Sequence, residues 1–145
     1  MIGEAHDPET HLIPLVLEAA RGGAPIQIFG TDYPTPDGTC VRDYVHVVDI
    51  ADAHVRALDY LLAGGTSSAF NLANARGYSV KEVIAAAERV CGRTISVKIA
   101  ARRAGDPAAL VGSAERARSV LGWSPARSEL DLQIEDAWKW IRSRN

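Results

Sequence analysis

The chain alternates between segments with helical spacing and short apolar runs, and this alternation constrains its fold more than any other feature. Helical spacing of apolar residues predicts helices at 12–21, 49–62, 79–91, 113–122 and 128–141. Apolar or alternating runs typical of strands lie at 26–29, 68–72 and 95–99, with an extended segment at 39–45. The order predicts an α/β fold, but the strands are too few for a complete doubly wound sheet.

The ends of the helices carry the sharpest local signals. Ser79 and Glu82 form a capping box in front of a helix that should end before Gly92. Asp49 is expected to cap the helix that runs to about Leu62. Further expected helix boundaries are the glycines at 22, 23 and 122 and the serines at 113 and 128. The expected buried face of the first helix comprises Leu12, Leu15, Val16 and Ala19.

Composition indicates one globular domain, because the 145 residues are 47% hydrophobic and 23% charged. A net charge of −2 argues against a basic nucleic-acid-binding protein. No apolar run approaches the roughly 18 residues of a membrane span, and residues 1–9 do not have the pattern of a secretory signal. The two cysteines, Cys40 and Cys91, fit neither a metal motif nor a disulfide framework, so we expect a cytoplasmic protein with reduced thiols.

Arginine greatly outnumbers lysine in the chain, by 13 to 3. One explanation is a GC-rich genome, which would give the imbalance no functional meaning. The other is that some arginines bind phosphate, because the planar guanidinium matches phosphate oxygens bidentately. The count alone does not choose between the two.

Several familiar catalytic motifs are absent from the sequence. It contains no GxGxxG, GxxxxGK, Tyr-x-x-x-Lys, GxSxG or HExxH, so we predict no catalytic residue in these 145 residues. A metal site built from His46, Asp49, Asp52 and His54 is also disfavoured. On one helix Asp52 and His54 point about 200° apart, and helix capping is the better explanation for Asp49. We therefore predict no metal site.

Three segments carry residues suited to binding an anionic, flat ligand. Segment 38–47 contains an Arg-Asp pair beside an aromatic residue, and segment 101–107 contains two arginines followed by Gly and Asp. Segment 27–30 could present backbone groups beside an aromatic ring to a flat base. A surface ion pair, a solvated basic loop and a buried core strand are the respective alternatives.

The motifs in these segments resemble those of a known family. The stretches 8–14, 28–33, 37–47 and 102–107, together with the closing Leu121-Gly122-Trp123, are similar in order and spacing to the C-terminal part of the UDP-glucose 4-epimerases, which belong to the extended short-chain dehydrogenase/reductases. The resemblance covers essentially the whole chain but only the second half of the family's chain. It implies an incomplete Rossmann-like fold, with residues 1–145 forming a single α/β nucleotide-sugar-binding domain.

The resemblance also implies a chemistry. The family interconverts UDP-glucose and UDP-galactose in galactose metabolism: a Tyr base takes a proton while hydride passes from the sugar to bound NAD and returns to its other face. The glycine-rich NAD site, the catalytic Tyr and Lys and the dimerisation helices all precede the matching region. We therefore expect this chain to anchor the UDP-sugar and to be inactive alone. The alternatives are a stand-alone nucleotide-sugar-binding module, a subunit completed by a separate NAD-domain chain, or part of a related dehydratase or epimerase.

Ten residues are implied in substrate binding. The resemblance assigns the diphosphate to Arg42 and Arg103, a ribose hydroxyl to Asp106, the uracil to Gln27, Ile28 and Phe29, the nucleotide sugar to His11 and Leu12, the pocket wall to Tyr44, and the surroundings of the hexose ring to Leu110. Many relatives have Asn where His11 stands. This interpretation requires Arg42 and Arg103 to line one hollow, and it predicts that faces adapted to the rest of the family's chain are apolar and exposed.

Overall fold

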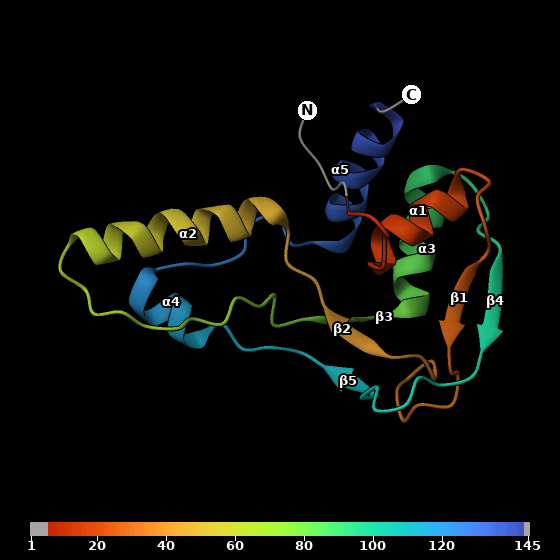
Figure 1. Ribbon diagram of the computed structural model, residues 1–145, viewed down its shortest axis with the longest axis horizontal. Coiled ribbons are helices and arrows are strands. Elements are labelled where there is room, and N and C mark those ends of the chain that lie inside the picture. The colour runs from red at the N-terminus through yellow and green to blue at the C-terminus, as the bar shows by residue number, and fades with distance from the viewer. Residues whose placement is uncertain (1–5, 144–145) are drawn as a thin grey trace.

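The computed structural model describes residues 6–143 and has an α/β architecture, as the sequence predicts (Figure 1). Its elements are α1 (Leu12–Ala20), β1 (Ile26–Phe29), β2 (Val41–Asp43), α2 (Val47–Leu62), β3 (Gly77–Ser79), α3 (Val80–Cys91), β4 (Val97–Ala100), β5 (Ala109–Leu110), α4 (Glu115–Leu121) and α5 (Leu130–Ser143). Within the described residues, none of the helices is long and apolar enough to cross a membrane.

The strands form two small sheets. In the first, β1 and β4 run parallel, with Ile26 opposite Val97. In the second, β2 lies between β3, which is antiparallel to it, and β5, which is parallel to it. The predicted strand at 68–72 is wrong, since these residues form no strand in the structure. Phe70 and Leu72 instead pack against a small core around Trp123, so their apolar pattern reflects burial without strand pairing.

The main core lies between α1, α3, α5 and β1, on the side of the molecule where α1, α3 and α5 are labelled in Figure 1. Its fully buried residues are Val16, Leu17, Val83, Ala86, Ala87 and Ile134. The predicted inner face of α1 is partly wrong. Leu15 is exposed, whereas Leu17 and Ala20 are buried. The inner face is therefore shifted around the helix, and Leu15 borders a cavity described below.

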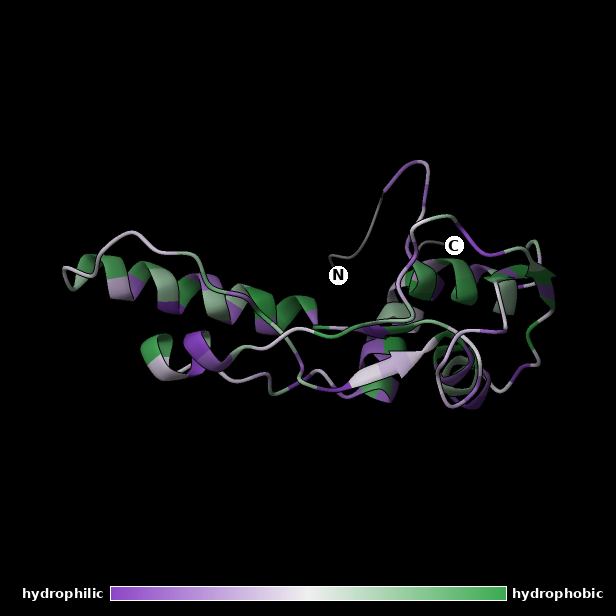
Figure 2. Cartoon of the chain, turned by 90° about the horizontal axis from the view of Figure 1, so that it is seen from below, coloured by the Kyte–Doolittle hydropathy of each residue, from purple (hydrophilic) through white to green (hydrophobic). Residues whose placement is uncertain are grey.

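A second core joins α2 to α4 around Trp123, which is completely buried. Both helices extend away from the main core (Figure 1). Apolar residues recur along α2, where Figure 2 shows green bands between hydrophilic ones. Several of these apolar residues are exposed. They include Val47, Val48, Val55, Leu58, Leu61 and Leu62, of which Leu62 is 77% exposed. This exposed apolar face of α2 matches the expectation drawn from the sequence.

The capping box is confirmed, because the Ser79 hydroxyl accepts from the Glu82 backbone N–H at 3.1 Å and the Glu82 carboxylate accepts from the Ser79 N–H at 2.7 Å. The predicted cap of α2 is wrong. His46 is the N-cap, and its Nδ1 accepts from the Val48 N–H at 3.0 Å. Asp49 lies buried within the first turn of α2, where its carboxylate accepts hydrogen bonds from Ala126 and Ser128.

Two other boundary expectations also differ from the structure. The N-cap of α4 is Ala114, which makes no side-chain cap, although the Ser113 hydroxyl accepts from the Glu115 N–H at 3.4 Å. Ser128 does not serve a helix end, because its hydroxyl donates to Asp49 at 2.7 Å and accepts from the His46 N–H at 3.0 Å. Strand β4 is mostly exposed, and Ile99 is 55% exposed. Tertiary contacts explain the change for Ser128, because its hydroxyl is bonded to Asp49 and His46.

Candidate nucleotide-binding site

A cavity of about 400 Å³ is bordered by α1, β1, β2 and the loop that follows β4. Seven of the ten residues predicted to bind substrate line it: Leu12, Gln27, Phe29, Arg42, Tyr44, Arg103 and Asp106. Arg42 and Arg103 therefore share one hollow although 60 residues separate them in the chain. The sequence interpretation required both arginines to line one hollow, and this requirement is met.

Arg42 is held in the cavity wall by two neighbours. It lies at the centre of β2, and its Nη1 donates to the Val41 carbonyl at 2.7 Å. Its Nη2 donates to the Asp106 carboxylate in a close ion pair. The other Asp106 oxygen accepts weakly from the Cys40 thiol at 3.5 Å. The carboxylate thus orients the guanidinium, which is about one quarter exposed and keeps donors available to a ligand.

Arg103 reaches the cavity by stacking on an aromatic ring. Its guanidinium lies 3.8 Å from the centre of the Phe29 ring, a favourable cation–π arrangement. The adjacent Arg102 turns the other way, where it pairs with Asp32 at 2.7 Å and stacks on Tyr33 at 4.0 Å. Neighbouring arginines in one loop therefore have different surroundings, and only Arg103 lines the cavity.

The edge of β1 presents backbone groups toward the cavity. The N–H groups of Ile26 and Gly30 bond to the β4 side, at Ser96 and Ala100. Because successive residues of a strand point their backbone groups to opposite sides, Gln27 and Phe29 face away from β4. Both residues also line the cavity. Their backbone amides and carbonyls are therefore placed to read the edge of a flat base.

Tyr44 closes one wall of the cavity and is partly buried. Burial raises the pKa of Tyr44 to about 12, against the opposing effect of the Arg42 charge. Its phenol is therefore neutral at physiological pH and can donate a hydrogen bond. At this pH the Tyr44 side chain is therefore a neutral hydrogen-bonding group and not a base.

Three of the predicted residues do not line the cavity. Ile28 is 3% exposed and belongs to the main core. Leu110 lies on β5 opposite Arg42 and is 62% exposed. His11 is exposed and pairs with Glu9 at 2.8 Å. For Ile28 and His11, flanking residues such as Phe29 and Leu12 reach the cavity, whereas neither neighbour of Leu110 lines it.

Other lining residues were not predicted from the sequence, among them Thr10, Leu15, Cys40 and Val80. Two of these had a usable signal. Leu15 follows Leu12 by three residues and so lies on the same side of α1. Cys40 precedes Arg42 by two residues in an extended segment, which places both on one face. Val80 had no such signal, because its position depends on the pairing of β2 with β3.

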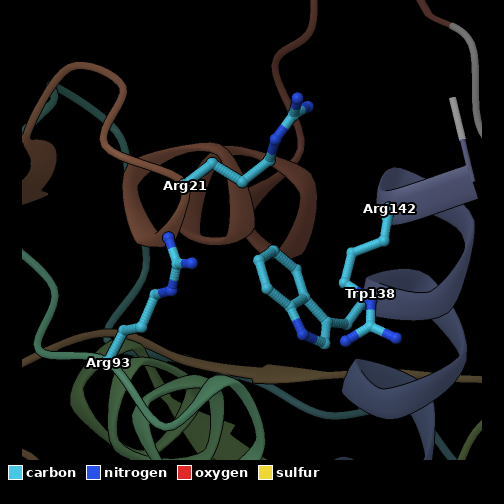
Figure 3. Close-up of a pocket in the computed structure, with 4 residues that line it drawn as sticks. All are labelled: Arg21, Arg93, Trp138 and Arg142. Carbon is cyan, nitrogen blue, oxygen red and sulfur yellow. The ribbon is translucent and has the colours of Figure 1, made fainter. Parts of the chain in front are cut away.

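A second cavity, of about 530 Å³, lies beside the main core and is lined by Arg21, Arg93, Trp138 and Arg142. Figure 3 shows Trp138 between Arg93 and Arg142. Each arginine is close to the C-terminal end of a helix. Cations at such ends are stabilised by the helix dipole, which accounts for the arginines as structural groups. None of the residues predicted to bind substrate lines this second cavity.

Comparison with known proteins places the first cavity in context. Residues 1–73, half of the chain, match the NAD-dependent epimerase/dehydratase family. The chain belongs to this family. Among curated proteins it is 54% identical to the UDP-glucose 4-epimerase of Lacticaseibacillus casei and 53% identical to that of Rhizobium meliloti. These alignments cover 96% and 99% of this chain, but only 42% and 44% of the two relatives.

Solved structures agree with the family assignment and confirm the α/β fold. A crystal structure of a UDP-glucose 4-epimerase matches with a TM-score of 0.94 at 49% identity, covering 99% of this chain and 44% of that one. The Bifidobacterium longum UDP-glucose 4-epimerase in complex with NAD+ and UDP matches with a TM-score of 0.83 at 39% identity, covering 92% of this chain and 39% of that one. The chain thus spans less than half the length of these epimerases.

NAD is the cofactor of the epimerase/dehydratase family, but the residues present here do not fit it. A Rossmann NAD site needs a glycine-rich turn between a strand and a helix N-terminus. In this chain β1 is followed by an irregular segment from Gly30 to Cys40 and then by β2. No sequence of the form GxGxxG occurs among the 145 residues. The described residues therefore provide no NAD site of the Rossmann type.

Proposed function

We propose that this chain supplies the UDP-sugar anchor of a UDP-glucose 4-epimerase, an isomerase that interconverts UDP-glucose and UDP-galactose in galactose metabolism in the cytoplasm. The observation that carries the proposal is the shared cavity of Arg42 and Arg103. The proposal is also supported by the similarity of nearly the full length of this chain to several UDP-glucose 4-epimerases.

The electrostatics of the cavity suit a diphosphate. Two guanidinium groups and one carboxylate line it, so its charged side chains sum to a positive value. Asp106 is already paired with Arg42, which leaves the charge of Arg103 to attract an anion. Guanidinium groups bind phosphate oxygens through charge-assisted hydrogen bonds, which are stronger than neutral ones. The diphosphate would lie between Arg42 and Arg103.

The remaining surfaces suit the other parts of a UDP-sugar. The exposed backbone edge at Gln27 and Phe29 would read the uracil, whose edge offers both donors and acceptors. Leu12 and Leu15 line the same cavity and offer the hexose few hydrogen bonds. A nucleotide held firmly and a sugar held loosely is the arrangement an epimerase requires, since the sugar must present both faces of one carbon.

Calorimetric titration of the chain with UDP tests the proposal. Each charged hydrogen bond is worth about 1.5–3 kcal/mol, so Arg103→Ala should weaken UDP binding about 10- to 150-fold. Arg42→Ala should weaken it further, because it leaves the Asp106 carboxylate unpaired beside the diphosphate. Arg102→Ala is the matched control: it removes the neighbouring charge, which pairs with Asp32 outside the cavity, and should leave affinity nearly unchanged.

Two results would contradict the proposal. The first is the absence of heat at millimolar UDP, and the second is an equal loss of affinity in Arg102→Ala and Arg103→Ala. Titration with dTDP and GDP then separates the related nucleotide-sugar enzymes. Tighter binding of UDP favours the epimerase, whereas a preference for dTDP or GDP favours a dehydratase or epimerase that acts on another nucleotide sugar.

A further inference from the structure

The segment in front of α1 brings together two imidazoles and a carboxylate. His6, Glu9 and His11 each offer a ligand atom, and the three atoms lie within 4.8 Å of one another. The two imidazole rings are 5.1 Å apart, centre to centre, and tilted by 47°. Both histidines are exposed, so an ion can reach them from solvent. All three residues come from one stretch of six residues.

Glu9 is held in place by its own neighbours. Its Oε1 accepts from the backbone N–H groups of Thr10 and His11, each at 2.7 Å, and contacts Nδ1 of His11 at 2.8 Å. Its Oε2 accepts no hydrogen bond from the residues that the structure describes. The hydrogen bonds to Oε1 therefore fix the orientation of the carboxylate beside His11.

We propose that His6, Glu9 and His11 bind a divalent cation of the zinc type. Imidazole and carboxylate are ligands that Zn²⁺ takes at about 2.0–2.2 Å, and three protein ligands with a water complete its usual four. Imidazole suits Zn²⁺ and its neighbours in the first transition row, whereas Mg²⁺ and Ca²⁺ prefer oxygen ligands. The ligand set therefore selects a borderline transition-metal ion.

Only small movements are needed to close the site. Two ligands of a tetrahedral zinc lie about 3.3 Å apart, given bonds of about 2.0 Å. Nδ1 of His11 and Oε1 of Glu9, now 2.8 Å apart, would separate by about half an ångström, and Nδ1 would release the proton of this hydrogen bond to solvent as the ion binds. His6 would approach by about 1.5 Å from the 4.8 Å limit, and rotation of its exposed side chain supplies such a shift.

The inference does not depend on the proposed binding of UDP. Thr10 and Leu12 line the nucleotide cavity, but His11 between them does not. The metal would therefore lie at the border of the cavity. It also differs from the histidine and aspartate group considered from the sequence, because Asp49 is committed to Ser128 and the backbone of Ala126 and Arg127.

Titration of the untagged, metal-stripped chain with Zn²⁺ by calorimetry tests this inference, and ¹H NMR of the imidazole protons gives a second readout. We expect one Zn²⁺ per chain, with shifts of two of the four histidine signals. His6→Ala and His11→Ala should each weaken binding at least about tenfold, since even outer-shell changes commonly cost that much. His54→Ala, which removes an exposed histidine on α2, is the matched control and should bind as the parent does.

A Cys40→Ser/Cys91→Ser variant should also bind Zn²⁺ as the parent does, because thiols are not part of the site. The inference is overturned if the parent chain binds no Zn²⁺, if His6→Ala and His11→Ala retain parental affinity, or if loss of the thiols or of His54 abolishes binding. His6 lies outside every helix and strand, so His6→Ala should fold normally. The NMR shifts of the unaltered chain identify the ligands without any substitution.

Discussion

Replacing Asp49 with alanine should destabilise the fold more than any other loss of a single carboxylate in the described residues. The Asp49 side chain is almost completely buried. It accepts from the backbone N–H of Ala126 at 3.0 Å, from that of Arg127 at 2.9 Å, and from the Ser128 hydroxyl at 2.7 Å. These bonds fasten the first turn of α2 to a segment more than 70 residues away.

The size of the effect follows from the donors that the alanine would leave unpaired. Each buried donor without an acceptor costs about 1–3 kcal/mol, so the three donors together should cost about 3–5 kcal/mol, allowing for partial rescue by water. That loss is a large part of the roughly 5–15 kcal/mol of a typical domain. Asp52→Ala on the same helix is the control, because Asp52 forms only an exposed pair with Arg56 and should cost at most about 1 kcal/mol.

The same residue predicts a dependence on pH. Burial works against its charge, but the bonds from Ser128, Ala126 and Arg127 hold the pKa of Asp49 below its ordinary value in the folded chain. A lowered folded pKa stabilises the fold above the unfolded value of about 4. That contribution is lost as pH falls through the folded pKa. Asp49→Asn lacks this titration, so its free energy of unfolding should fall less steeply on acidification.

Urea unfolding followed by circular dichroism at several pH values measures both effects. The reasoning is refuted if Asp49→Ala and Asp52→Ala lose the same free energy of unfolding within about 1 kcal/mol, the limit for an exposed pair. It is also refuted if Asp49→Asn retains the full acid dependence of the parent chain.

Three further predictions follow from other parts of the molecule. The chain alone should show no interconversion of UDP-glucose and UDP-galactose in an NADH-coupled assay, because its 145 residues contain neither Tyr-x-x-x-Lys nor GxGxxG; turnover above background would contradict this. The exposed apolar face of α2 should cause self-association, which Leu58→Lys should reduce in sedimentation experiments; a monomeric parent chain would count against it. Gly38→Ala should be more destabilising than Gly105→Ala in thermal unfolding. Both glycines have positive φ, of 80° and 78°, but a Cβ at Gly38 would collide with the Thr31 carbonyl oxygen, whereas one at Gly105 would meet nothing within 4 Å. Equal losses for the two glycines would exclude this explanation.

The sequence predicted best where the cause of a structure lies within a few residues. The capping box of Ser79 and Glu82 needs donors and acceptors only three positions apart, and it is present as predicted. Strand β1 has its predicted bounds, and Gly92 and Gly122 end their helices in the left-handed conformation. The prediction failed at Asp49. Aspartate is a good N-cap residue, but this carboxylate accepts hydrogen bonds from residues 126–128, and His46 caps α2 instead.

For the candidate site, too, some features could be predicted from the sequence and others depend on the tertiary structure. The sequence by itself identified the loops with arginines, through motifs whose order resembles that of a known family. Only the tertiary structure shows whether Arg102 or Arg103 lines the cavity, because Arg102 pairs with Asp32 and stacks on Tyr33 outside it. It also decided that His11 faces Glu9 outside the cavity. Local sequence determines which polar and charged groups a segment carries. The packing of segments that are far apart in the chain determines which of these groups come into contact, because buried donors and charges form bonds with the partners that lie next to them in the folded structure.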